Sequence, residues 1–205
     1  LENDILPKLR KEFPGVYWDF EGEQSEQAET IASMNYLYMI ALIIIYGLLA
    51  IPFSSYIQPI IVMAAIPFGL IGAIWGHVVM GMDVTILSGF GVVALTGVVV
   101  NDSLVMVDYV NRKRSIGLKE MEAARQAGMS RFRPIILTSL TTFAGLTPLL
   151  LEKSLQAKFL IPMGISLGFG VIFATVITLI LVPSMYLILE DIRSFFKKVR
   201  MILFG

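Results

Sequence analysis

Long apolar blocks dominate this 205-residue chain, and charged residues fall between them. No Asp, Glu, Lys or Arg occurs from Ile31 to Met82, and this run would measure about 78 Å as one straight helix. The hydrocarbon core of a bilayer is about 30 Å thick and accommodates about 20 helical residues, so the run must fold back on itself. The turn-forming residues of 52–55 and Pro59 mark the position of the turn. This position predicts membrane spans over 33–51 and 60–79.

Three further uncharged blocks extend the pattern. One covers 84–101 and continues past Asp102 toward Tyr109, and the others cover 134–151 and 159–189. Charged residues make up 16% of the chain, against about a quarter in an ordinary soluble domain. The pattern therefore predicts an all-α membrane protein, a helical bundle of five transmembrane helices.

Basic residues set the expected orientation. The connection over 111–133 carries seven Lys and Arg against two Glu, and such an excess marks the cytoplasmic side of a membrane. Counting spans places the basic tail over 193–205 on the same side. Residues 1–30, with eight acids and three bases, then lie outside the cell membrane.

The expected domain organisation has three parts. Residues 1–30 read as a short helix followed by a strand, too little to fold alone, and we expect them to end a larger external α/β domain. Residues 31–192 form the bundle, with an amphipathic helix at about 115–129 on the cytoplasmic surface. For that helix the pattern favours a solvated connector over a regulatory element. The tail over 193–205 is cytoplasmic, and we expect the chain to be a piece of a longer protein.

Asp102 is the residue that most needs an explanation, because a charged carboxylate near the bilayer centre costs about 2.5–3.5 kcal/mol on insertion scales. Asn101 and Asp108 extend a polar seam along the same predicted helix. Asp102 is either a structural acid bound by hydroxyls or part of a proton pathway, and the residues alone leave both interpretations open. Hydroxyl partners that could face it cluster in the fourth span: Thr138, Ser139, Thr141 and Thr142.

Other candidate residues have simpler interpretations. Small residues at three-residue spacing predict a helix-packing face, formed by Gly91, Ala94 and Gly97. Asp108 lies one helical turn before the basic cluster at 112–114, which favours an ion-paired residue over a functional acid. Asp83 is expected to cap the third span. His77 lacks a second ligand nearby in sequence, and a structural role is favoured.

Composition excludes several classes of function. A net charge of zero argues against a nucleic-acid partner. The chain has no Cys and one His, which leaves no material for an iron–sulfur cluster or a thiolate metal site, and we expect neither metal nor cofactor. No phosphate-binding lysine follows the glycines, and no nucleophile–base pair is evident. We therefore expect a protein that is not an enzyme.

Two runs carry a family resemblance: TGVVVNDSLVMVDY over 96–109 and GMSRFRPIILTSL over 128–140. They resemble the C-terminal membrane half of resistance-nodulation-division (RND) efflux transporters of the AcrB/AcrD/AcrF type. Residues 14–30 resemble the end of the porter domain in the same family. The resemblance covers essentially the whole chain and implies that the five spans are the eighth to twelfth of a twelve-helix subunit.

The resemblance also implies a function. Members of the family are proton-driven antiporters that export drugs, detergents, bile salts or metal ions. They are commonly homotrimers in the bacterial inner membrane and work with a periplasmic adaptor and an outer-membrane channel. The expected partner of this chain is the N-terminal half of the same transporter.

In drug-exporting members, two aspartates of the fourth span pair with a lysine and a threonine. By motif position the lysine falls on Asn101 and the threonine on Thr138. Asn101 cannot carry a proton, so either Asp102 takes part of that role or coupling uses another charge arrangement. An accessory of the SecD/SecF kind and a scaffold that has lost coupling remain the alternatives.

Overall fold

The computed structural model describes the backbone of residues 22–204 and the side chains of residues 25–193. This part of the chain is helical and contains no strand. Five of its segments are long and apolar enough to cross a membrane: Ser25–Phe53, Gln58–Met80, Ile86–Ser115, Glu120–Leu151 and Leu155–Arg193. The predicted all-α bundle of five membrane helices is confirmed. The helix and strand expected within residues 1–21 lie outside the described residues.

The first membrane helix, α2, runs over Glu23–Phe53. Residues 22–37 belong to one compact unit of the chain, and Tyr38–Gly205 form a second unit that contains the bundle. Within the second unit, Tyr38 on α2 hydrogen-bonds through its hydroxyl to Thr96 Oγ1 at 2.8 Å.

The second span consists of two helices, α3 over Gln58–Met63 and α4 over Ile66–Met80. Pro67 has no backbone N–H, so it cannot donate the hydrogen bond that a continuous helix would make to the carbonyl one turn earlier. The chain turns at residues 64–65, and the Phe68 amide returns to the Ala65 carbonyl at 3.2 Å. The interruption thus falls just before this proline, which occupies the first turn of α4.

A tight turn joins α4 to α5. Gly81 adopts φ +63°, which glycine tolerates without a steric penalty, and its amide bonds to the Val78 carbonyl while the Met82 amide reaches back to His77. The next helix, α5, covers Ile86–Ser115 and begins with Thr85 as its N-cap. The prediction that Asp83 caps this helix is wrong, because Thr85 stands one residue before the first helical position and Asp83 lies too early.

The third connection is shorter than the sequence suggested. After α5 the chain turns at Gly117, with φ +93°, and α6 covers Glu120–Leu151 without a break. The amphipathic segment expected as a separate helix over 115–129 therefore forms the end of this turn and the first turns of α6. Gly128 lies near the end of this segment and Pro134 at the start of the predicted span, and α6 continues through both.

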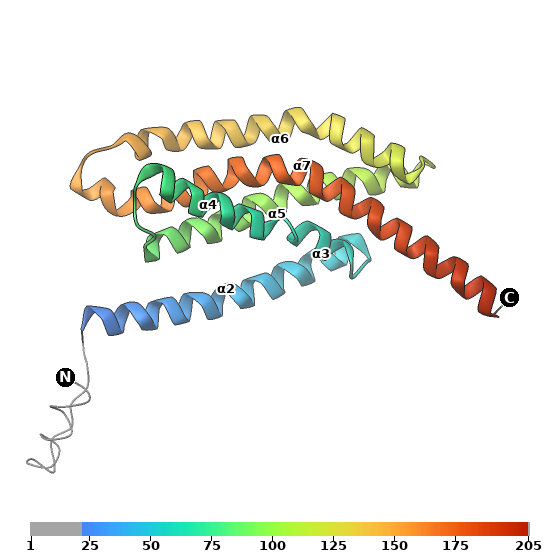
Figure 1. The fold of residues 1–205 in the computed structure, drawn as a ribbon, viewed down its shortest axis with the longest axis horizontal. Coiled ribbons are helices and arrows are strands. Elements are labelled where there is room, and N and C mark those ends of the chain that lie inside the picture. The colour runs from blue at the N-terminus through green and yellow to red at the C-terminus, as the bar shows by residue number, and fades with distance from the viewer. Residues whose placement is uncertain (1–21, 205) are drawn as a thin grey trace, which may run out of the picture. The chain divides into compact units, whose positions relative to one another are not determined.

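The last helix, α7, covers Leu155–Phe204 and packs against α4, α5 and α6 (Figure 1). Glycines permit the close approach, since a Cβ at Gly72 or Gly76 would collide with Phe173 or Phe169 of α7. The core between these helices is apolar, and its largest cluster includes Val107 of α5.

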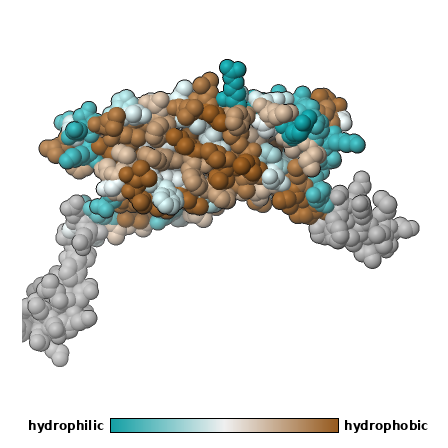
Figure 2. Space-filling model, turned by 45° about the horizontal axis from the view of Figure 1, so that its top comes forward, coloured by the Kyte–Doolittle hydropathy of each residue, from teal (hydrophilic) through white to brown (hydrophobic). Residues whose placement is uncertain are grey.

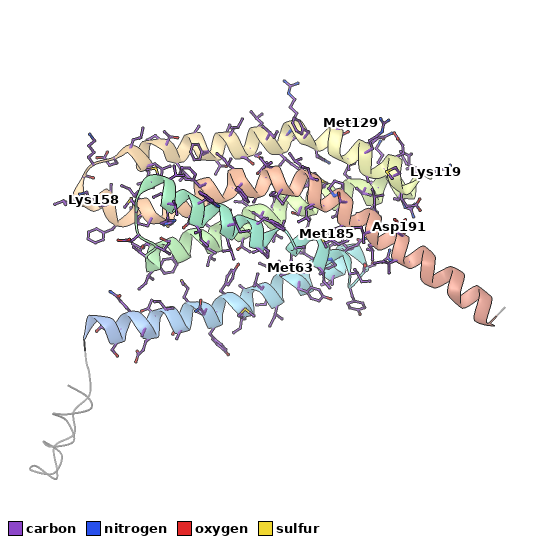
Figure 3. The ribbon with its side chains drawn as sticks, in the orientation of Figure 1. Met63, Lys119, Met129, Lys158, Met185 and Asp191 are labelled. Carbon is purple, nitrogen blue, oxygen red and sulfur yellow. The ribbon has the colours of Figure 1, made fainter. Side chains whose placement is uncertain are left out.

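Polar residues collect at the two ends of the bundle. Figure 2 shows a brown apolar middle between teal ends on the face in view. Lys119 and Asp191 lie at one end and Lys158 at the other (Figure 3). This distribution fits a protein that spans a membrane, with the connection between α5 and α6 on one side and that between α6 and α7 on the other.

Candidate functional site

Asp102 lies in the middle of the apolar span of α5 at the edge of the packed core. Its neighbours Val100 and Ser103 are buried, while Asp102 is partly exposed and Asn101 is exposed. Among the residues that the structure describes, none forms a hydrogen bond or an ion pair with the Asp102 carboxyl group. The bundle therefore holds an acid at membrane depth without supplying the partner that such an acid requires.

The hydroxyl groups of α6 do not supply that partner. Thr138 donates to the Ile135 carbonyl at 2.8 Å, and Thr141 and Thr142 likewise donate to backbone carbonyls of their own helix. Ser139 is buried and pairs with Thr175 of α7 at 2.6 Å. Helical Ser and Thr readily bond to the preceding turn in this way. The interpretation of Asp102 as a structural acid held by these hydroxyls finds no support in the described chain.

Ser103 is a residue that the sequence reasoning overlooked. Its side chain is 1% exposed, and its hydroxyl has no hydrogen-bond partner among the described residues. Leaving a buried hydroxyl unpaired costs about 1–3 kcal/mol, so such groups are uncommon and often have a function. Its position beside Asp102 was the signal that could have identified it.

The C-terminal end of the polar seam on α5 is dominated by cations. Asp108 is ion-paired with Arg112 at 2.8 Å, and both side chains are open to solvent. The ring of Tyr109 lies 5.4 Å from the Lys113 Nζ atom and 5.1 Å from the Arg131 guanidinium. Asp108 thus has an ordinary ion-pair partner, in contrast to Asp102.

The three small residues of α5 separate in the structure. A Cβ at Gly91 would collide with the Met163 carbonyl and the Ser166 side chain of α7, so Gly91 packs as expected of a small-residue face. Ala94 and Gly97 are exposed, and a Cβ at Gly97 would meet nothing within 4 Å. Steps of three residues turn a helix by about 300°, so the row drifts around α5 from the packed side to the side of Asn101.

A second polar cluster, also missed from the sequence, closes the end of the bundle that carries Lys119. Arg114 forms ion pairs with Glu120 of α6 and with Glu190 of α7, and Glu190 also binds Arg193 at 3.0 Å. These side chains line a cleft of about 490 Å³ together with Asp191. The basic and acidic side chains of these ion pairs neutralise one another, so a structural role in joining the helices explains the cluster. In the described part of the chain, no group of three or more His, Cys, Asp or Glu residues is placed to hold a metal ion.

Comparisons with known proteins identify the family and a similar fold. The sequence profile of the AcrB/AcrD/AcrF family matches residues 4–190. Two crystal structures of a heavy metal efflux pump are similar in fold. Crystal form II has a TM-score of 0.75 and 25% sequence identity, over 90% of this chain and 19% of that chain. Crystal form I has a TM-score of 0.73 and 26% identity, over 91% of this chain. The chain thus spans 19% of the length of the chain in each of these two structures.

Proposed function

Because the chain belongs to the AcrB/AcrD/AcrF family of membrane efflux transporters, we propose that it is the C-terminal membrane portion of a proton-driven pump that exports drugs and other xenobiotics. In this proposal it works as part of a homotrimer in the bacterial inner membrane, with a periplasmic adaptor and an outer-membrane channel. Its N-terminal segment is periplasmic and its C-terminus cytoplasmic, in the orientation that the basic connections indicate.

The observation that carries the coupling role is the unpartnered carboxyl group of Asp102. An acid at this depth is stable only against protein or water, and this bundle leaves it partly exposed on the side where Asn101 and Gly97 are open. We infer that the N-terminal half of the same transporter covers that side and supplies the partner of Asp102. The small side chains of Ala94 and Gly97 permit a helix to approach closely there.

In this mechanism Asp102 takes up and releases the coupled proton. Asn101 and Thr138 are neutral hydrogen-bonding groups, and neither exchanges a proton at ordinary pH. Their role is to orient the groups that pair with Asp102. Asp108 contributes through its ion pair at the membrane surface rather than as a proton carrier.

The cargo class separates two candidate functions. Export of organic xenobiotics follows from the resemblance of the two motifs that surround Asp102 and Thr138. Export of heavy metal ions is favoured by the two similar structures, both of a heavy metal efflux pump. Export assays of the full-length pump with a metal salt and with a panel of drugs distinguish them.

The coupling role is tested by Asp102→Asn in the full-length pump. We expect export to fall to the level of cells without the pump, while expression and trimer assembly stay unchanged. Asp108→Asn is the matched control, because it neutralises an acid on the same helix that already has a partner, and it should retain export. Retained export in Asp102→Asn would refute the relay role.

Thr138→Ala gives a second comparison. We expect it to impair export with a smaller loss of stability than Asp102→Leu, since Thr138 donates only to its own backbone. Thermal melting in detergent measures the stability difference. Equal melting losses would contradict this assignment.

A further inference from the structure

His77 lies buried in the last turn of α4 and links it to the start of α5. The side chain is 4% exposed. Its Nδ1 atom is 2.9 Å from the Ala73 carbonyl oxygen, and its Nε2 atom is 2.8 Å from Ser88 Oγ. A carbonyl oxygen only accepts hydrogen bonds, so Nδ1 carries a hydrogen. In the neutral ring, Nε2 therefore accepts the hydroxyl hydrogen of Ser88.

Ser88 belongs at the same time to the N-cap of α5. Its Oγ atom accepts the backbone N–H of Thr85 at 3.0 Å, and its own backbone N–H donates to Thr85 Oγ1 at 3.4 Å. The two hydroxyl oxygens are 3.5 Å apart. The Ser88 hydroxyl thus faces two acceptors, the imidazole at short range and the Thr85 oxygen at long range.

We propose that His77 is a proton-binding latch between α4 and α5. A proton added to Nε2 converts this atom from an acceptor into a donor, and the His77–Ser88 hydrogen bond reverses its direction. The Ser88 oxygen then accepts from His77 and from the Thr85 amide. Its hydroxyl hydrogen rotates toward Thr85 Oγ1, no covalent bond breaks elsewhere, and one proton from the adjacent aqueous phase is bound.

This reversal acts on the beginning of α5. The Thr85–Ser88 distance of 3.5 Å is long for an O–H···O hydrogen bond, so the rotated hydrogen finds only a weak acceptor and the strong bond to the imidazole nitrogen is lost. A positive charge beside the N-terminus of α5 is also unfavourable for that helix, because the helix dipole is positive there. Protonation therefore loosens or reshapes the first turn of the helix that carries Asp102.

No charged group of the packed helices offsets a charge on His77. Residues 66–80 of α4 and 86–101 of α5 contain no Asp, Glu, Lys or Arg. The side chain that α7 places against the adjacent Gly76 is Phe169, and the ring of Phe143 from α6 packs against Phe169 in an edge-to-face contact. The charged residues at this end of the bundle are exposed: Asp83, Glu152, Lys153 and Lys158.

The latch is placed where protons can reach it. The connection over 81–85 is open to solvent apart from Met82, and Thr85 is exposed one hydrogen bond away from Ser88. In the orientation proposed above, this connection faces the external side of the membrane. External acidity would then be sensed at α5 separately from proton transfer at Asp102, and the latch itself does not depend on the cargo or on export.

Hydrogen–deuterium exchange of the full-length protein in detergent tests the latch without any transport step. The readout is the protection factor of the amides over 86–90, measured over a series of buffers from neutral to acidic pH. We expect protection in the wild type to fall about threefold to tenfold at the acidic end, the range expected from weakening one hydrogen bond. In His77→Gln, which cannot bind the proton, protection should be the same at both ends.

Two further variants keep the test decisive. Ser88→Ala retains the imidazole but removes its connection to the cap, so it should also abolish the pH response, and it decides the question if His77→Gln does not assemble. Asp83→Asn removes the nearest acid in the connection and should preserve the response. The proposal is overturned if the wild type shows no pH response, if His77→Gln or Ser88→Ala retains it, or if Asp83→Asn abolishes it.

Discussion

Gln58 and Asn111 form a reciprocal pair of amide hydrogen bonds although they are 53 residues apart. Gln58 Nε2 donates to Asn111 Oδ1 at 3.1 Å, and Asn111 Nδ2 donates to Gln58 Oε1 at 2.9 Å. The Tyr186 hydroxyl of α7 donates to the same Asn111 oxygen at 3.0 Å. One half-buried asparagine thereby connects the start of α3, the C-terminal part of α5 and α7.

Loss of Asn111 should destabilise the protein more than loss of Gln58. Asn111→Leu leaves both Gln58 and Tyr186 without a partner, and each orphaned buried group costs about 1–3 kcal/mol. Gln58→Leu leaves only Asn111 incompletely bonded, and that residue keeps Tyr186. Unfolding of the full-length protein in detergent, with the double variant completing a thermodynamic cycle, measures the coupling. Additive effects of the two substitutions would contradict the pairing.

Gly91 should not tolerate even a methyl group. A Cβ there would lie 2.8 Å from Ser166 Cβ and would collide with the Met163 carbonyl of α7, so the helices must separate. We expect Gly91→Ala to destabilise by about 1–3 kcal/mol, the usual effect of overpacking. Gly128→Ala is the matched control, because a Cβ at that helical position meets nothing within 4 Å and should be neutral or stabilising. Comparable melting temperatures of the two variants would show that α5 and α7 do not pack this closely.

Glu152 should make the start of α7 sensitive to acid. The backbone N–H groups of Ser154 and Lys153 donate to its carboxylate at 3.0 and 2.9 Å and hold the pKa of Glu152 below its ordinary value of 4.5. A pKa lowered by folding stabilises the folded form above the ordinary value, and this effect is lost as the pH falls through the folded pKa. Exchange protection of these two amides should therefore fall in that acidic range.

The control for this prediction is Glu152→Gln. The amide oxygen of glutamine can still accept these bonds but does not titrate in acid, so the acid-dependent loss of protection should disappear. Persistence of the loss in the variant would assign it to another group.

The number and type of the membrane helices could be read from the sequence because each depends on a local property. A run of about 20 uncharged residues must cross or fold back, whatever surrounds it. The boundaries of the helices were less predictable. An amphipathic pattern over 115–129 predicts a helix, but it does not show whether the backbone hydrogen bonds of that helix continue into the next span, as they do in α6. The cap of α5 likewise depends on the side-chain geometry of Thr85, two residues beyond Asp83.

The candidate site was identified only in part. An acid inside an apolar run is visible in any sequence, so Asp102 could be singled out from the free-energy cost of a carboxylate inside a bilayer. Its lack of a partner was not visible, because hydrogen-bonding hydroxyls on a neighbouring helix can equally bond to their own backbone, as Thr138 does. Ser103 and the pairing of His77 with Ser88 were missed because each depends on which face a residue presents after packing.

The sequence by itself determined that this chain is an all-α membrane protein with five spans, and it located the one acid that membrane burial makes expensive. These properties depend on hydrophobic free energy and on the length of helix that a bilayer accommodates, and both act within a single segment. Only the tertiary structure decided which small residues meet α7, which polar groups pair across helices, and which side of α5 is left open. Those outcomes depend on rotations of about 100° per residue and on contacts between distant segments, which no local pattern specifies.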